Sequence, residues 1–154
     1  MPQADELPHC VCGALRTVTR AVTQIYDDAM RPAGLRITQY SLLVRIARLG
    51  PVSAAALVGA LHADQTTLAR ALKLLEKDRL VRRAPQPDRR VKRIELTPQG
   101  RRKLAEARVL WDQAQRRAVG LIGQADWSDL RGRLGLLLAA VARESRAAKP
   151  RGSL

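Results

Sequence analysis

The stretch DQTTLARALKLLEKDRLVRRAPQPDRRVKRIELTP, residues 64–98, is the part of the chain that determines its fold. In its first half Leu68, Leu72 and Leu75 recur at spacings of four and three, the period of a helix with one buried face. Its second half places two short runs that suit strands, LVRRA and VKRIELT, on either side of the loop PQPDRR. The stretch therefore predicts a helix over residues 64–78 that is followed directly by a β-hairpin.

Two further helices are expected immediately upstream. The sequence GPV at 50–52 ends a helix over 38–49, for which Thr38 is the expected N-cap. Ser53 then caps a short helix, SAAALVGALH, and Asp64 caps the helix described above. Two short helices joined by a tight turn form a helix-turn-helix, and a hairpin directly after it makes a winged helix. We expect this winged helix to occupy residues 36–97, with inward-facing Leu42, Leu43, Ile46 and Leu49 on its first helix.

The two ends of the chain predict long amphipathic helices. A helix over 11–29 carries an apolar stripe of Val11, Leu15, Val18, Val22, Ile25 and Ala29, and Pro32 and Gly34 end it. Pro98 begins a helix whose inner side is Leu104, Trp111, Ala114, Ala118 and Leu121. Asp126 is the expected cap of a last helix with Trp127, Leu130, Leu134, Leu137 and Val141 on one side.

These stripes exceed what a small winged helix can cover. We interpret 10–31 and 98–148 as dimerisation helices from both termini, since DNA operators commonly have two-fold symmetry. An intramolecular bundle that caps a single monomer is the alternative. The expected fold is thus mainly α with a small β-hairpin wing, arranged as one domain over residues 1–154.

The charge of the chain points to a polyanionic partner. The 154 residues carry a formal net charge of +14, with a pI near 11.4. Residues 1–30 hold two arginines and four acids, a net charge of −2, whereas residues 64–103 hold 13 Lys or Arg and 5 acids, a net charge of +8. Charge that serves solubility alone has no reason to segregate in this way, whereas a binding surface does.

Other function classes find little support in the sequence. The chain has no apolar run of 18 residues and no apolar segment near its acidic start, so we expect a cytoplasmic protein without a membrane span or signal peptide. It has two histidines, and neither a glycine-rich phosphate loop nor a nucleophile–base motif stands out. We therefore expect no enzymatic activity and no cofactor.

The helix over 64–78 offers a polar face for DNA. Gln65, Thr66 and Thr67 lie in its first turn, where short side chains reach base edges and backbone N–H groups hold phosphate. Arg70, one turn further, is the best candidate for a bidentate contact with guanine, and Lys73 lies on the same face. A face that is merely solvated is the alternative, and it explains Lys77 better than it explains Arg70.

The tip of the hairpin concentrates positive charge. Arg89 and Arg90 suit a narrow minor groove, where the potential is most negative. Asp88 would be repelled by phosphate, so we expect it to hold one of these arginines by paired hydrogen bonds. Lys92 on the return strand, like Arg82, Arg83 and Arg93, either contacts the DNA backbone or stays hydrated.

Together these motifs resemble the MarR family of bacterial transcription regulators. The resemblance rests on Asp64, Thr66, Thr67 and Arg70 in the recognition helix; on Leu75, Glu76, Leu80 and Val81; on the D-R-R wing at 88–90; and on Leu96, Thr97 and Gly100. Arg79 departs from it, since glycine is common there. The resemblance implies a homodimer with winged helices in successive major grooves of a pseudo-palindromic operator, and usually repression. We therefore expect a sequence-specific regulator; a non-specific architectural DNA-binding protein is the alternative.

The effector is left open by the sequence. HCVCG, residues 9–13, suits oxidant sensing because a helix N-terminus favours thiolate, but Cys10 and Cys12 are about 200° apart on a regular helix. They can cooperate only where the chain is irregular or across a dimer. A metal site from His9 and both cysteines, with His62 as one possible fourth ligand, and cysteines without a function are the alternatives. A pocket for a small ligand would draw on Tyr26, Tyr40 and Trp111, although core packing is the more ordinary role of each.

Overall fold

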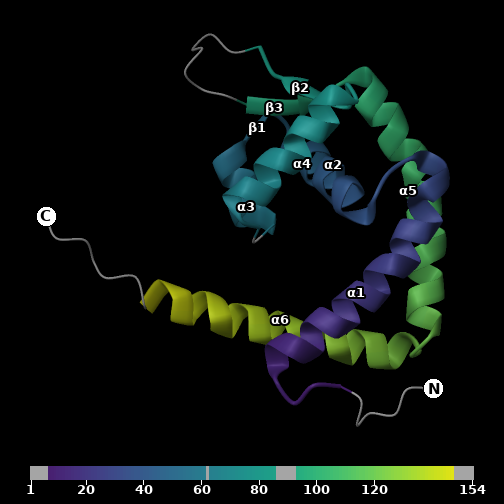
Figure 1. Ribbon diagram of the computed structural model, residues 1–154, viewed down its shortest axis with the longest axis vertical. Coiled ribbons are helices and arrows are strands. Elements are labelled where there is room, and N and C mark those ends of the chain that lie inside the picture. Colours follow the sequence, from purple (N-terminus) through teal and green to yellow (C-terminus); the bar gives the residue numbers. More distant parts are fainter. Residues whose placement is uncertain (1–6, 62, 86–92, 148–154) are drawn as a thin grey trace, which may run out of the picture. The chain divides into compact units, whose positions relative to one another are not determined.

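The computed structural model describes residues 7–61, 63–85 and 93–147 of the chain. The chain divides into two compact units, Met1–Gln115 and Arg116–Leu154. The elements of the first unit are α1 (Val11–Met30), the short 3₁₀ helix η2 (Arg31–Ala33), α2 (Ile37–Leu49), β1 (Val52–Ser53), α3 (Ala54–Leu61), α4 (Gln65–Lys77), β2 (Val81–Arg83), β3 (Arg93–Leu96) and most of α5 (Pro98–Gly120) (Figure 1). The second unit holds the end of α5 and α6 (Gln124–Ala147).

The strands form a three-stranded antiparallel sheet in the order β1-β3-β2. Val81 pairs with Leu96 and Arg83 with Ile94 between β2 and β3, as the hairpin prediction requires. Val52 of β1 pairs with Ile94 on the other side of β3. The sequence did not indicate β1, so the hairpin is in fact two strands of a larger sheet. This third strand ties the start of the helix-turn-helix to the wing.

The core of the first unit lies between the sheet and helices α2, α3 and α4. Leu43, Ile46, Leu57 and Leu75 are fully buried there, and the expected inward residues Leu68 and Leu72 are buried with them. In Figure 1 the strands lie next to α3 and α4, and α2 contacts β3. The amphipathic pattern of residues 64–78 therefore predicted correctly which face of α4 is buried.

Helix ends are where the sequence predictions failed. Helix α2 begins at Ile37, not after Thr38, because the Asp27 carboxylate of α1 accepts the N–H of Ile37 at 2.7 Å and so caps α2 from a distance. Helix α6 begins at Gln124, after Gly123 with its positive φ of 94°, so Asp126 lies within the first turn rather than at the cap. Leu49 and Leu121, predicted to face inward, are 51% and 67% exposed, since each lies where its helix ends.

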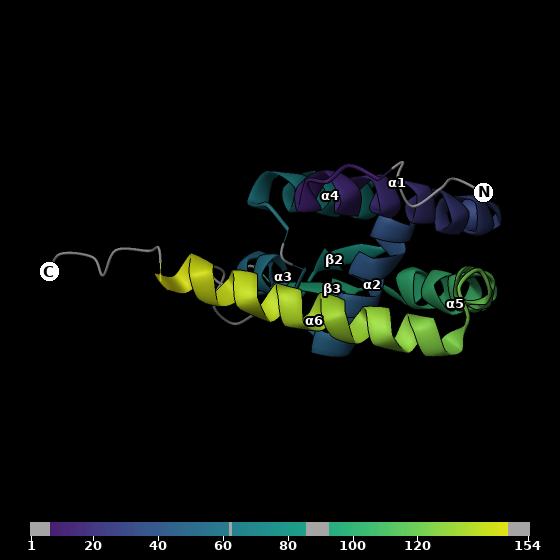
Figure 2. The same cartoon turned by 90° about the horizontal axis from the view of Figure 1, so that it is seen from below.

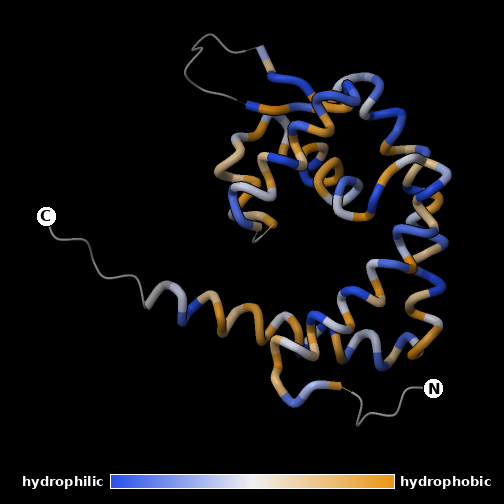
Figure 3. Tube along the Cα trace, viewed as in Figure 1, coloured by the Kyte–Doolittle hydropathy of each residue, from blue (hydrophilic) through white to orange (hydrophobic). Residues whose placement is uncertain are grey.

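The predicted apolar stripes of α1 and α6 are present and remain exposed. Val11, Leu15, Val18 and Val22 of α1 are all exposed. Helix α6, which Figure 2 shows as one uninterrupted helix, likewise exposes Leu130, Leu134, Leu137 and Val141. Figure 3 shows hydrophobic residues recurring along both helices. Each helix considered by itself therefore presents apolar surface that a further partner would cover.

Candidate nucleic-acid interface

The helix-turn-helix is formed by α3 and α4, which contact each other. Ser53 caps α3, as predicted: its Oγ accepts the N–H of Ala56 at 3.2 Å. Asp64 caps α4, also as predicted, and its Oδ1 accepts the N–H of Thr67 at 2.8 Å. Both helix starts are therefore fixed by short polar side chains, which gives the first turn of α4 a defined position.

The polar face of α4 is accessible. Its exposed residues include all five predicted DNA contacts on this helix, which are Gln65, Thr66, Thr67, Arg70 and Lys73. Among the described residues no carboxylate lies within ion-pair distance of Arg70 or Lys73. The two side chains thus keep their charge and hydrogen-bond donors for a ligand that carries phosphates and base edges.

The Asp64 cap carries a pH dependence. Hydrogen bonds from the side chain and backbone of Thr67 hold the pKa of Asp64 below its ordinary value of 3.8, and Arg70 contributes less. Because the folded state favours the ionised carboxylate, its stabilisation is fully present above pH 3.8 and is lost as the pH falls through the lowered pKa.

We expect the advantage of wild type over Asp64→Asn to shrink in acid, since asparagine keeps a capping oxygen without the charge. Thermal melts of both proteins between about pH 3 and 6, a range that brackets the ordinary carboxyl pKa, measure this difference. A difference in Tm that is constant over this range would show that the ionised carboxylate is not the group that caps α4.

The base of the wing is held by two arginines. Arg82 on β2 pairs across the sheet with Glu95 on β3, with 2.8 Å between Nε and Oε1. Arg93 donates from Nη1 to the carbonyl of Pro51 at 3.3 Å, which ties β3 to the segment before β1. The sequence suggested contacts with the DNA backbone or hydration for both arginines, and it missed these internal roles. The predicted wing contacts Asp88, Arg89, Arg90 and Lys92 lie outside the described residues.

The thiols of HCVCG lie at the start of α1. Cys10 is the N-cap residue with extended backbone (φ −67°, ψ 122°), Cys12 is the second helical residue, and both are exposed free thiols. The chain is therefore irregular at Cys10, one of the two conditions under which the pair can cooperate. Within the described part of the chain, no three His, Cys, Asp or Glu side chains gather as a metal site would require, and His62 lies outside it.

The aromatic candidates lie between helices. Tyr40 of α2 is buried and stacks on Trp111 of α5, with ring centroids 6.1 Å apart. Tyr26 of α1 donates its hydroxyl hydrogen to Oε1 of Gln115 at 2.6 Å. Burial raises the pKa of both tyrosines, so both stay protonated at neutral pH. The three aromatic residues thus hold α1 and α2 against α5.

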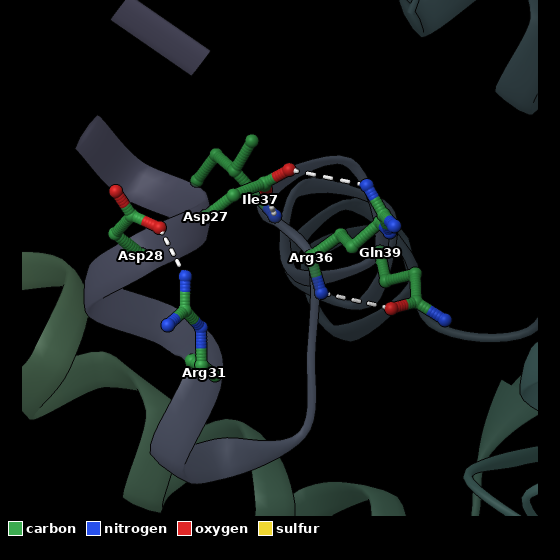
Figure 4. Close-up of polar contacts among 6 residues, drawn as sticks. All are labelled: Asp27, Asp28, Arg31, Arg36, Ile37 and Gln39. Atoms are coloured by element: carbon green, nitrogen blue, oxygen red, sulfur yellow. Dashed lines mark hydrogen bonds and ion pairs between the residues drawn. The ribbon is translucent and has the colours of Figure 1, made fainter. Parts of the chain in front are cut away.

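A cavity of about 400 Å³ lies elsewhere, where α1 passes into α2. Figure 4 shows its charged side chains: Asp28 pairs with Arg31, and Asp27 lies 3.6 Å from Arg36. Gln39 accepts the N–H of Arg36 at 2.8 Å, which stiffens the same turn. None of the three aromatic candidates lines this cavity. No periodic pattern in the sequence indicates this cavity, because its residues meet only through the turn between the helices.

Known proteins agree with this geometry. Residues 35–92 match the sequence model of the MarR family. The transcriptional regulator MosR of M. tuberculosis, solved in complex with DNA, is 34% identical with a TM-score of 0.75, over 92% of this chain and 99% of that one. The chain belongs to the MarR family. It is accordingly a DNA-binding transcriptional regulator and not an enzyme.

Two further solved structures have the same MarR fold. A probable transcriptional regulator from Pseudomonas aeruginosa is 26% identical with a TM-score of 0.75, over 88% of this chain and 99% of that one. A MarR-family regulator from Rhodococcus sp. RHA1 is 26% identical with a TM-score of 0.68, over 82% of this chain and 94% of that one. No protein with curated function matches the chain.

Along the described residues, no helix combines the length and apolarity needed to cross a membrane.

Proposed function

We propose that the protein is a homodimeric repressor that binds a pseudo-palindromic operator and is released by thiol oxidation or by a small ligand. The observation that carries this proposal is the first turn of α4, where a fixed N-terminus presents Gln65, Thr66 and Arg70 to solvent. A helix of this kind enters the major groove, and its first residues contact base edges. The MosR structure with DNA supports the same use of the fold.

The exposed stripes support the proposed dimerisation. Val11, Leu15, Val18 and Val22 on α1, and Leu130, Leu134 and Leu137 on α6, form apolar surfaces that a monomer in water leaves uncovered. The helices over residues 10–31 and 98–148 of two chains would bury these surfaces. Each chain would then form one domain, in which the winged helix occupies residues 36–97. Two recognition helices per dimer then match two operator half-sites about 34–36 Å apart. We also propose that the protein is located in the cytoplasm, where such DNA lies.

Specific binding separates this proposal from a non-specific architectural role. An operator-binding regulator should prefer its own upstream DNA to a scrambled duplex by roughly 10³-fold or more. An architectural protein would bind both equally, with a steep dependence on salt. Fluorescence anisotropy with the two duplexes, at one stated salt concentration, decides between them.

For the effector we favour oxidation of Cys10 and Cys12. One molecule of hydrogen peroxide takes two electrons from two thiols and yields one disulfide and two waters, and a dithiol reverses the reaction. The disulfide would join either the pair within one chain or cysteines of two chains. A change at the start of α1 would reach the dimer surface directly, because Val11 and Leu15 of the stripe lie in the same first turns.

Mild peroxide is expected to lower operator binding reversibly in the wild type and not in the Cys10→Ser/Cys12→Ser variant. Anisotropy before peroxide, after peroxide and after reductant measures this. Unchanged binding of the wild type would exclude the thiols as the sensor. A small ligand would then be the proposed effector, and its candidate site is the charged cavity between α1 and α2, lined by Asp27, Arg31 and Arg36.

A further inference from the structure

Helix α4 ends in a tight hydrogen-bonded turn. The N–H of Arg79 donates to the carbonyl of Glu76 at 3.0 Å, and the N–H of Leu80 donates to that of Leu75 at 2.9 Å. Arg79 has the positive φ of 57° that this kind of helix ending requires, and which usually selects glycine. The turn leads the chain from α4 into β2 and contains the carbonyls of residues 78–80.

The start of α5 supplies a donor for each of these carbonyls. The Thr97 hydroxyl donates to the carbonyl of Arg79 at 2.7 Å. The N–H of Thr97 donates to the carbonyl of Leu80 at 3.1 Å, and the Gln99 amide reaches that of Asp78 at 3.4 Å. The turn that follows the recognition helix is thus hydrogen-bonded to residues at the start of α5.

The Thr97 hydroxyl also caps α5. Its Oγ1 accepts the N–H of Gly100 at 2.9 Å, in the manner of an N-cap residue. Gly100 fits closely against the same turn, because a Cβ at this position would lie 1.9 Å from the carbonyl oxygen of Leu80. The one Thr97 hydroxyl therefore hydrogen-bonds both to the turn that follows α4 and to the first turn of α5. We call this closely packed contact between residues 78–80 and 97–100 the joint between α4 and α5.

Helix α5 is itself held to the rest of the first unit. Trp111 stacks on Tyr40 of α2, and Gln115 accepts the hydroxyl hydrogen of Tyr26 of α1. The orientation of α4 relative to α1 and α2 consequently depends on its joint with α5 as well as on the core that α4 shares with α2 and α3. Base contacts need this orientation to within small tolerances, whereas attraction to phosphates does not.

We propose that Thr97 is a positioning residue for operator recognition: its hydroxyl fixes the orientation of α4, and so sets the preference for operator over random DNA. This inference rests on the proposed function. Loss of the hydroxyl would let α4 tilt without removing a single positive charge. Operator affinity should fall, while affinity for random duplex and the slope of binding against salt should stay the same.

The test compares Thr97→Val, which keeps the shape and removes the hydroxyl, with Thr97→Ser, which keeps the hydroxyl. Anisotropy on operator and scrambled duplexes, well below the Tm of every variant, gives the preference ratio. We expect Thr97→Val to lower this ratio about tenfold, the effect of about one lost base contact, and Thr97→Ser to restore it. Ser53→Ala is the matched control, because it removes a capping hydroxyl at α3 and should lower the Tm without changing the ratio.

Two results would overturn the inference: a Thr97→Val variant with the wild-type ratio, or an equal drop in Ser53→Ala. If Thr97→Val does not fold, Gln99→Ala replaces it, because it removes only the exposed bond to the Asp78 carbonyl. A smaller drop in the ratio is then expected, and no drop would contradict the inference. A wild-type protein that binds both duplexes equally would instead refute the proposed function itself.

Discussion

Replacement of Arg70 by alanine is expected to weaken operator binding by about 1–3 kcal/mol, or roughly 5- to 150-fold in Kd. Arg70 is exposed on α4, six residues after the Asp64 cap, and no described carboxylate is close enough to pair with it. Its guanidinium can therefore donate two hydrogen bonds to the edge of one guanine. The loss should relax base preference at one position in each half-site.

Lys77→Ala is the matched control for Arg70→Ala. Lys77 lies on the same exposed face but at the other end of α4, about two turns after Arg70. We expect it to change operator affinity little and to leave base preference unchanged. Anisotropy with operators substituted one base pair at a time measures both. If Arg70→Ala weakens every duplex equally, Arg70 contacts phosphate and another residue of the first turn contacts the bases.

Local patterns were enough to predict the helices and the hairpin. The helix predicted over 11–29 is Val11–Met30, and that predicted over 64–78 is Gln65–Lys77. The outward position of Arg70 followed from the same period, because the buried leucines of α4 leave only one polar face. In such segments the side chains that decide the structure are neighbours in the sequence.

Features that depend on distant contacts were missed. The strand β1 has two residues and exists only because Val52 and Ser53 pair with β3, about forty residues later. The cap of α2 comes from Asp27, ten residues before the N–H that it accepts. Thr97 and Gly100 belonged to a recognisable motif, but nothing in the pattern showed that they meet the end of α4. Periodicity carries no information about such partners, since they are set by packing.

Arg79 shows how a departure from a pattern is accommodated. The sequence places arginine where the resemblance favours glycine, and the structure gives Arg79 a φ of 57°. A side chain in this region costs about 1–2 kcal/mol of backbone strain. Three hydrogen bonds offset that strain: the one from the Thr97 hydroxyl to the Arg79 carbonyl and the two backbone hydrogen bonds of the turn. The joint between α4 and α5 therefore holds the helix ending in place even without the residue type that best suits it.

The same joint predicts the largest effect on stability. Gly100→Ala would place a Cβ 1.9 Å from the oxygen and 2.9 Å from the carbon of the Leu80 carbonyl, both backbone atoms that no rotamer change can move. Either α5 or the start of β2 must shift, and the bonds from Thr97 to this turn lengthen or break. We expect a loss of at least about 3 kcal/mol in the free energy of unfolding. Urea unfolding at one fixed protein concentration measures it, since a dimer's stability depends on concentration.

Gly59→Ala is the control that isolates the close contact, because Gly59 also lies within a helix, α3, but nothing lies within 4 Å of its added Cβ. There alanine should stabilise the protein by about 0.5–1 kcal/mol, since it restricts the unfolded chain. The same chemical change is thus expected to have opposite signs at the two positions. If Gly100→Ala is tolerated as well as Gly59→Ala, α5 does not approach Leu80 closely in solution. The Thr97 hydroxyl could not then hold α4 in the orientation that operator recognition requires.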